Sequence, residues 1–310
     1  MKRVSVSIVG AGRLGTALAE RLAAAGYNIS EIIICANRQS LSDAKQLARK
    51  VETQLLAFRE AELTAGLVWF CVPDAEISKA ATALLSHKWK GKIAVHSSGV
   101  LTSDVLSPLR QKGGHIASAH PLMTFVRGSV PQLERVPFAL EGDRIALRAV
   151  REIVKDLGGN SISVRKQDKV AYHAFATMVC PLLVSLLAAA EQTAALARMS
   201  SAEARRRMMP ILRQTLANYE KLGPSAAFSG PIVRGDIETV REHLRAMGEA
   251  PAAKRAYISL ANAALECLPS RNTQELRELL REITSGITPR NSTRTHQAST
   301  RSARRKRRFP

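Results

Sequence analysis

Three groups of polar residues in this 310-residue chain combine side-chain types and spacings that could do chemistry. In the first group, Lys169 and His173 are four residues apart, which places them on one face of a predicted helix. A lysine whose pKa is lowered by burial, or the histidine beside it, could act as a general acid toward a bound carbonyl. The same spacing also fits an exposed lysine and a hydrogen-bonded core histidine, so the pattern leaves both interpretations open.

The second group occupies two short loops at the ends of predicted strands. One loop reads His96-Ser97-Ser98-Gly99 and the other His120-Pro121. Ser97 and Ser98 could hold a substrate carboxylate or carbonyl, and either histidine could transfer a proton near neutral pH. Alternatively, the serines cap turns and the histidines bond to backbone.

The third group is the loop Ser229–Asp236 between two predicted helices. Arg234 in this loop could bind an acidic substrate through two parallel hydrogen bonds. Asp236 is the expected N-cap of the helix that follows, and a structural turn is the simpler interpretation of the whole loop.

The elements that must position these groups begin with a strand, a tight turn and a helix near the N-terminus. The strand Val6–Val9 leads into Gly10-Ala11-Gly12-Arg13-Leu14-Gly15, and an alanine-rich helix follows. Gly10 would permit the turn, Gly12 would let a pyrophosphate approach the backbone, and Gly15 would let the helix pack on the strand. This context predicts a dinucleotide-binding site rather than a plain tight turn.

The end of the second predicted strand, Glu31–Ala36, indicates which dinucleotide is bound. NAD sites carry an acidic residue there for the ribose 2′-hydroxyl, and this chain has none. Arg38, flanked by Asn37 and Ser40, offers charge and donors that suit a 2′-phosphate. We therefore predict NADP, with NAD less favoured and a solvated turn arginine as the structural alternative.

Residues 1–160 alternate predicted strands and helices, which is typical of a doubly wound parallel Rossmann sheet. Ligands of such sheets bind beyond the carboxyl ends of the strands, where both histidine loops and Val72-Pro73-Asp74 fall. Residues 161–285 are predicted to form an all-helical domain, whose first long helix bends at Pro181. The fold class is therefore α/β with a helical C-terminal domain.

The formal net charge of +20 is unevenly distributed, since the last 25 residues contribute +8 of it. Residues 286–310 contain no acid and almost no apolar residue, so we predict a basic disordered tail that could bind a polyanion weakly. A solvated tail without a partner is the simpler interpretation.

Other features of the composition bear on the protein's environment. The segment Val170–Ala190 has no charge and could span a bilayer, but its polar residues and alanines favour a helix buried among other helices, without a membrane. The four cysteines suit neither a metal site nor disulfides, so we predict reduced core residues in a cytoplasmic protein without a signal peptide.

Taken in order, these segments resemble the bacterial Rossmann-like proteins whose helical C-terminal domain has no assigned function, in the 6-phosphogluconate dehydrogenase-like superfamily. The resemblance covers about residues 4–285. It rests on the glycine motif and on Val72-Pro73-Asp74, His96–Gly99, Ala119-His120-Pro121-Leu122, Lys169 with Tyr172-His173, and Ser229–Asp236. It implies a Rossmann domain, a helical domain that forms a homodimer, and a site in the cleft between the domains.

The resemblance also implies roles for single residues. In β-hydroxyacid dehydrogenase relatives a serine loop holds the substrate carboxylate, and Ser97 and Ser98 occupy its place. Those relatives carry a lysine and an asparagine at i,i+4, whereas here Lys169 is followed by His173. This departure leaves the proton donor open among Lys169, His173 and His120. The His120-Pro121 loop is similar to one in prephenate and arogenate dehydrogenases, which favours an acidic substrate.

We therefore expect an NADP-dependent oxidoreductase that transfers hydride to or from a small carbonyl, imine or hydroxy-acid substrate. Ser97, Ser98 and Arg234 would orient that substrate. The alternatives are a non-catalytic NADP(H)-binding regulatory protein and a polyanion-binding protein that uses the tail.

Overall fold

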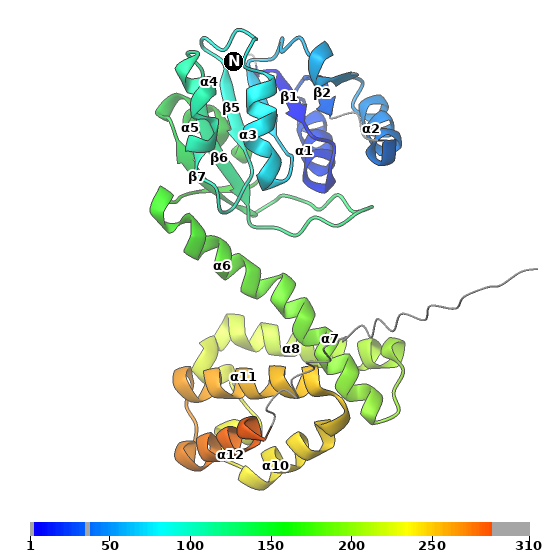
Figure 1. Cartoon of the computed structure of the whole chain (residues 1–310), viewed down its shortest axis with the longest axis vertical. Helices are drawn as coiled ribbons and strands as arrows, with labels where there is room; N and C mark the ends of the chain where they lie inside the picture. Colours follow the sequence, from blue (N-terminus) through cyan, green and yellow to red (C-terminus); the bar gives the residue numbers. More distant parts are fainter. Residues whose placement is uncertain (1–2, 35–37, 287–310) are drawn as a thin grey trace, which may run out of the picture. The chain divides into compact units, whose positions relative to one another are not determined.

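Two compact units make up the chain, Met1–Leu183 and Val184–Pro310. The computed structural model describes residues 3–34 and 38–286, and Figure 1 shows the elements of both units. The first unit extends past the predicted boundary at residue 160, because the helix that begins at Lys169 belongs with the sheet. The predicted tail lies outside the described residues, apart from Gly286.

The first unit is built on one mostly parallel sheet, as the sequence predicts. Its described strands are β1 (Val6–Val9), β2 (Ile29–Ile34), β3 (Gln54–Ala57), β4 (Leu67–Phe70), β5 (Ile93–His96), β6 (His115–Pro121), β7 (Pro137–Gly142) and β8 (Asn160–Ser163). They lie in the order β3-β2-β1-β4-β5-β6-β7-β8. The prediction that all neighbours are parallel is wrong at one place, since β6 and β7 pair antiparallel. Residues 122–136, which contain no helix, join these two strands, and antiparallel neighbours need no crossover helix.

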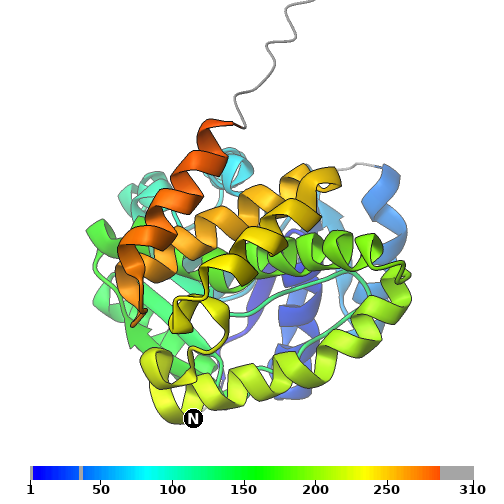
Figure 2. The ribbon, with the colours of Figure 1, turned by 90° about the horizontal axis from the view of Figure 1, so that it is seen from below.

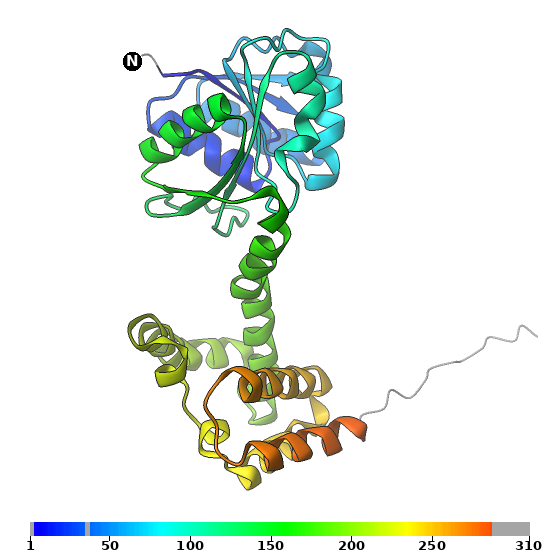
Figure 3. The ribbon, with the colours of Figure 1, turned by 90° about the vertical axis from the view of Figure 1, so that its left-hand side faces the viewer.

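Helices cover both faces of this sheet (Figure 3). On one face lie α1 (Arg13–Ala24), α2 (Arg38–Lys50) and α5 (Arg144–Asp156). On the other face lie α3 (Asp74–Ala83) and α4 (Ser107–Gln111). The last complete helix of the unit is α6 (Lys169–Val179).

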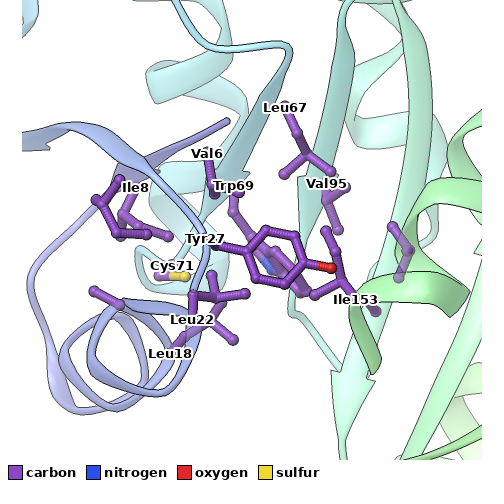
Figure 4. Packing of buried hydrophobic residues seen from close by; sticks show 14 of the residues in the cluster. Val6, Ile8, Leu18, Leu22, Tyr27, Leu67, Trp69, Cys71, Val95 and Ile153 are labelled. Carbon is purple, nitrogen blue, oxygen red and sulfur yellow. The ribbon is translucent and has the colours of Figure 1, made fainter. Parts of the chain in front are cut away.

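The central strands β1, β4 and β5 are buried on both faces, which is why they read largely as apolar runs. In β4, Trp69 packs in the cluster under α1 and α5, and Phe70 packs in the opposite cluster under α3. Both side chains are completely buried. Figure 4 shows part of the first cluster around Trp69.

The second unit is helical, as the sequence predicts. Its described helices are α7 (Pro181–Leu196), α8 (Ser201–Ala227), α9 (Pro231–Arg234), α10 (Ile237–Ala246), α11 (Pro251–Cys267) and α12 (Thr273–Ser285). Figure 2 shows them with α12 in orange-red. Leu244, Ile258 and Leu279 belong to the apolar core that joins α10, α11 and α12.

The helix ends test three predictions of the sequence. The predicted bend at Pro181 is confirmed as a break, since Cys180 between α6 and α7 has φ −119° and ψ −83°. Asp236 caps α10 as predicted, accepting a hydrogen bond from the Thr239 N–H at 3.2 Å. The spacing of Asn272 and Glu275 predicts a capping pair at the start of α12, and this prediction is wrong. Asn272 adopts a left-handed backbone, and its side-chain amide donates to the Gly235 carbonyl at 3.0 Å instead.

Two predictions of burial also need correction. The segment Lys166–Leu196 is long and apolar enough to span a membrane, but none of its most apolar window is buried within the chain. The predicted burial among other helices is therefore not found within this chain. Among the cysteines, Cys71 is buried as predicted, whereas Cys267 is exposed on α11, and Cys35 lies outside the described residues.

Candidate active site at the carboxyl edge of the sheet

The loop between β1 and α1 has the geometry of an anion-binding turn. Gly10 adopts φ +101°, and a Cβ there would lie 2.8 Å from a Val72 methyl group. A Cβ on Gly15 would overlap the Gly10 carbonyl oxygen, so α1 packs against the turn only because both residues are glycines. By contrast, a Cβ on Gly12 would meet nothing within 4 Å.

The open space at Gly12 lies at the N-terminus of α1. No side chain caps this helix, and its first turn contains no acidic residue. The first N–H groups of α1 are therefore free to bind an anion, and the helix dipole favours one. These residues fit the pyrophosphate of a dinucleotide, with Ala11, Arg13 and Leu14 forming the same turn.

The residues predicted to select NADP cannot be placed to the same degree. Asn37 lies outside the described residues, and so do the side chains of Arg38 and Ser40 at the start of α2. Their proposed contact with a 2′-phosphate stays a prediction.

The loop after β5 is fixed by the hydroxyl of Ser98. Ser98 Oγ donates to Asp74 Oδ2 at 2.8 Å and accepts from the Val100 and Leu101 N–H groups at 3.2 and 2.9 Å. Asp74 begins α3 just after Val72 and Pro73, so this bond ties the β4 loop to the β5 loop. The predicted contact of Ser98 with substrate stays a prediction, and its hydroxyl is engaged within the protein.

His96 also fixes the loop after β5 through two hydrogen bonds. Its Nδ1 accepts from the Ser98 N–H at 3.1 Å, and its Nε2 lies 3.1 Å from the Thr102 carbonyl. The ring must therefore carry its proton on Nε2. Burial, together with the nearby Lys169 ammonium, lowers the pKa of His96 to about 4. His96 is a neutral structural residue at physiological pH.

Ser97 links the loop to the core and to the second histidine loop. Trp69 Nε1 donates to Ser97 Oγ at 2.9 Å, and His120 Nδ1 lies 3.1 Å from the Ser97 carbonyl. The second contact requires a proton on Nδ1, which leaves His120 Nε2 to accept or hold another proton. Burial lowers the pKa of His120, and the bond to Ser97 opposes that effect.

Lys169 is buried at the start of α6, with 1% of its surface exposed. Its Nζ donates to the Ser98 carbonyl at 3.1 Å and to Ser118 Oγ at 2.8 Å. Burial lowers the pKa of Lys169, while the carboxylates of Glu141 and Asp74 act in the opposite direction. The ammonium thus anchors α6 to the ends of β5 and β6.

This anchor brings His173 against the two loops. The rings of His173 and His120 pack edge to face with centroids 5.6 Å apart. A Cβ on Gly99 would overlap His173 Cδ2 and would lie 3.1 Å from His120 Cε1. Both imidazoles therefore rest on the bare backbone of Gly99. The structure brings together Ser97, Ser98, His120, Lys169 and His173, while their roles toward a substrate stay predictions.

Two residues of this cluster, Glu141 and Tyr172, have no role predicted from the sequence. Glu141 is buried, and its carboxylate accepts from the Ser103 backbone and hydroxyl at 2.5 and 2.8 Å. Tyr172 packs edge to face on His120, with ring centroids 6.4 Å apart. Its position on α6, three residues after Lys169, is the signal that could have identified it.

Arg234 lies in the second unit at the end of α9. Its side chain is 63% exposed, and its guanidinium is 3.9 Å from Asp236. Its role toward substrate stays a prediction.

Comparisons with known proteins agree with this architecture. Residues 1–121 match the Rossmann-like domain, and residues 136–264 match a domain of unknown function, DUF2520. No curated protein matches the chain.

Solved structures with the same fold include several reductases. A candidate NADP oxidoreductase from Bacteroides fragilis aligns over 84% of this chain and 97% of its own, with TM-score 0.73 and 22% identity. An imine reductase from Pseudomonas sp. aligns over 90% and 100%, with TM-score 0.59 and 20% identity. A reductive aminase from Aspergillus terreus, in complex with NADPH and ethyl-5-oxohexanoate, aligns over 89% and 99%, with TM-score 0.60 and 15% identity. The chain thus matches the Rossmann-like domain in its first part and DUF2520 in its second, and it shares its fold with these solved structures.

Proposed function

We propose that this protein is an NADP(H)-dependent oxidoreductase that acts on a small carbonyl, imine or hydroxy-acid substrate. One observation carries the proposal. The open N-terminus of α1 and the His120–His173 pair lie at the same carboxyl edge of one sheet, within one unit. The reductases that share the fold support it, since one of them is a complex with NADPH.

The cofactor would be held by residues at the start of α1 and at the start of α2. The N–H groups at the start of α1 would bind the pyrophosphate, and Arg38 with Asn37 and Ser40 would bind the 2′-phosphate. Bound NADP(H) supplies or accepts the hydride.

The chain itself must handle the proton that accompanies hydride transfer. Reduction of a carbonyl or imine adds hydride to carbon and a proton to oxygen or nitrogen. His120 is suited to that proton, because its Nδ1–H is fixed on Ser97 and its Nε2 has no hydrogen-bond partner among the described residues. As an imidazolium it would donate the Nε2 proton during reduction, and as the neutral ring it would accept one at Nε2 during oxidation. His173 packs beside it. We assign Lys169 to positioning, since its ammonium is bonded to Ser98 and Ser118.

Calorimetric titration with NADP⁺, NADPH, NAD⁺ and NADH tests the proposal. We expect NADP(H) to bind at least tenfold more tightly than NAD(H), and Arg38→Ala to remove that preference. Arg49→Ala, at the other end of α2, is the matched control and should keep it. Absence of binding of all four dinucleotides at millimolar concentration would overturn the proposal. Binding without turnover of any carbonyl or imine would favour the regulatory protein instead.

We also propose that a second copy of the chain covers the apolar surface of the second unit. This surface is formed by large apolar side chains that are more than a third exposed, namely Val184, Leu186, Leu196, Met209, Ile211, Leu216, Tyr219, Leu222 and Leu260. A groove of about 390 Å³, lined by apolar residues of α7 and α11, continues it. Arginines 205, 206, 207 and 213 stand on α8 among these residues, which argues against a lipid partner.

Light scattering of the purified protein tests this assembly. We expect a dimer that Ile211→Glu converts to a monomer, since Ile211 is 67% exposed on α8. Val126→Glu is the matched control, because Val126 is 53% exposed on the sheet unit, and it should leave the dimer intact. A monomeric wild-type protein, or binding to lipid vesicles in place of self-association, would contradict the proposal.

A further inference from the structure

The candidate site contains a hydroxyl group without a hydrogen-bond partner. Among the described residues, the buried side-chain polar atoms that lack one are Thr53 Oγ1 and the Tyr172 hydroxyl. Thr53 precedes the edge strand β3, away from the candidate site. An unpartnered buried hydroxyl costs free energy, because it has given up its hydrogen bonds to water without replacing them.

Tyr172 is held firmly in this position. Lys169, three residues earlier on α6, is fixed to Ser98 and Ser118. His173, the next residue, rests on Gly99. The Tyr172 ring itself packs edge to face on His120. Rotation of α6 away from the loops would break these contacts, so moving the Tyr172 hydroxyl out of the site would cost free energy.

The surroundings of this hydroxyl are part polar and part apolar. Phe175, one turn further along α6, packs against the Tyr172 ring with centroids 6.2 Å apart. Half of the Phe175 side chain is exposed, so it offers an apolar contact beside the polar cluster. Burial raises the pKa of Tyr172, so the phenol keeps its proton at physiological pH and remains a hydrogen-bond donor.

We propose that the Tyr172 hydroxyl donates a hydrogen bond to the acceptor atom of the substrate, a carbonyl oxygen or imine nitrogen, while Phe175 contacts an apolar substituent on the same molecule. This proposal rests on the proposed function. It defines the substrate class as uncharged carbonyl or imine compounds with an apolar substituent. It also explains why the chain leaves a buried hydroxyl unpaired, since the substrate supplies the missing acceptor.

A matched pair of tyrosine variants tests the proposal. Tyr172→Phe removes the unpartnered hydroxyl, and Tyr257→Phe removes a hydroxyl that lies 3.2 Å from His243 Nδ1 in the second unit. In urea denaturation of the protein without ligand, we expect Tyr172→Phe to unfold at the same urea concentration as wild type or higher. Tyr257→Phe should unfold at the same urea concentration or a slightly lower one, because water can replace the lost partner of the exposed His243. A clear loss of stability in Tyr172→Phe would show that its hydroxyl is already partnered and would overturn the proposal.

Binding provides the second measurement. NADPH is titrated first, and then 2-pyrrolidinone and cyclohexanone are titrated into protein saturated with NADP⁺. We expect Tyr172→Phe to bind NADPH as wild type does and to bind the two carbonyl probes about tenfold more weakly, with Tyr257→Phe unchanged.

The outcomes separate the two proposals. Equal binding of the probes by wild type and Tyr172→Phe overturns the role of Tyr172 and leaves the cofactor assignment standing. Failure of wild type to bind either probe, with NADPH bound normally, likewise overturns the role of Tyr172 and leaves the cofactor assignment standing. Failure to bind NADPH overturns the proposed function as well.

Discussion

Replacing Gly99 with alanine should displace the His173 ring without removing any polar group from the site. The added methyl would overlap His173 Cδ2 and would lie 3.0 Å from His173 Cγ and 3.1 Å from His120 Cε1. Ordinary contacts between carbon atoms are about 3.5–4.0 Å, so the His173 ring must move by on the order of 1 Å. Gly99 does not have a positive φ, so backbone strain adds nothing to this effect.

The expected cost follows from this overlap. Overpacking of a close-packed site costs about 1–3 kcal/mol, and a misplacement of about 1 Å lowers a reaction rate by on the order of 10²-fold. Urea unfolding should therefore show a loss of about 1–3 kcal/mol with an unchanged slope, and NADPH binding should be preserved. Gly248→Ala is the matched control, because a Cβ at Gly248 meets nothing within 4 Å.

A double-mutant cycle identifies the cause. In a His173→Ala background the ring is absent, so Gly99→Ala should cost less than about 1 kcal/mol of stability. Equal costs in both backgrounds would refute the reasoning, because the clash would then lie elsewhere.

Three further changes probe other parts of the structure. Ser200→Ala should lower stability by about 1 kcal/mol, measured by urea unfolding, because Ser200 Oγ caps α8 by accepting from the Glu203 N–H at 3.3 Å. Because the pKa of His96 is lowered to about 4 in the folded protein from 6.5, stability should fall by up to about 3 kcal/mol as the pH drops from about 6.5 to about 4. His96→Asn should lack this part of the pH dependence, and an identical profile would contradict the assignment. Lys169→Met should lower stability by about 1–3 kcal/mol, since the Ser98 carbonyl and Ser118 lose their donor. Because Lys169 positions the loops, the variant should also raise KM, whereas loss of a proton donor would mainly lower kcat. A loss confined to kcat and its pH profile would return Lys169 to a catalytic role.

The sequence predicted those parts of the fold that local chemistry determines. The glycine spacing at Gly10–Gly15 requires one specific turn, and the structure has it. Pro181 cannot donate a backbone hydrogen bond, and the long helix breaks there. These signals depend on residues that are neighbours in the chain, so they can be recognised without knowledge of the tertiary structure.

The edge strands and the last part of the sheet were harder to predict. Strand β8 is exposed along its whole length, so it carries no apolar pattern, and β3 has only partly buried residues. The antiparallel pairing of β6 and β7 depends on the path of the connecting loop, which composition does not reveal.

The candidate site shows the same division. Its location followed from the rule that loops at the carboxyl ends of strands converge, which predicted that Ser97 and His120 lie together, whereas the position of Lys169 on α6 did not follow from that rule. The role of each residue depends on tertiary hydrogen bonds that the sequence does not reveal, such as the bond from the Ser98 hydroxyl to the Asp74 carboxylate. An apolar helix such as α7 likewise has the same sequence pattern whether its own chain or another molecule covers it.

The bond between Trp69 and Ser97 has an optical consequence. The chain contains two tryptophans, and both are buried, Trp69 completely and Trp89 with 1% of its surface exposed. The Trp89 indole donates to the Leu84 carbonyl, whereas the Trp69 indole donates to the loop that also holds His120. Any rearrangement of that loop changes the surroundings of one indole and leaves the other as an internal reference. The protein thus carries its own fluorescent reporter of the state of the candidate site, with no label required.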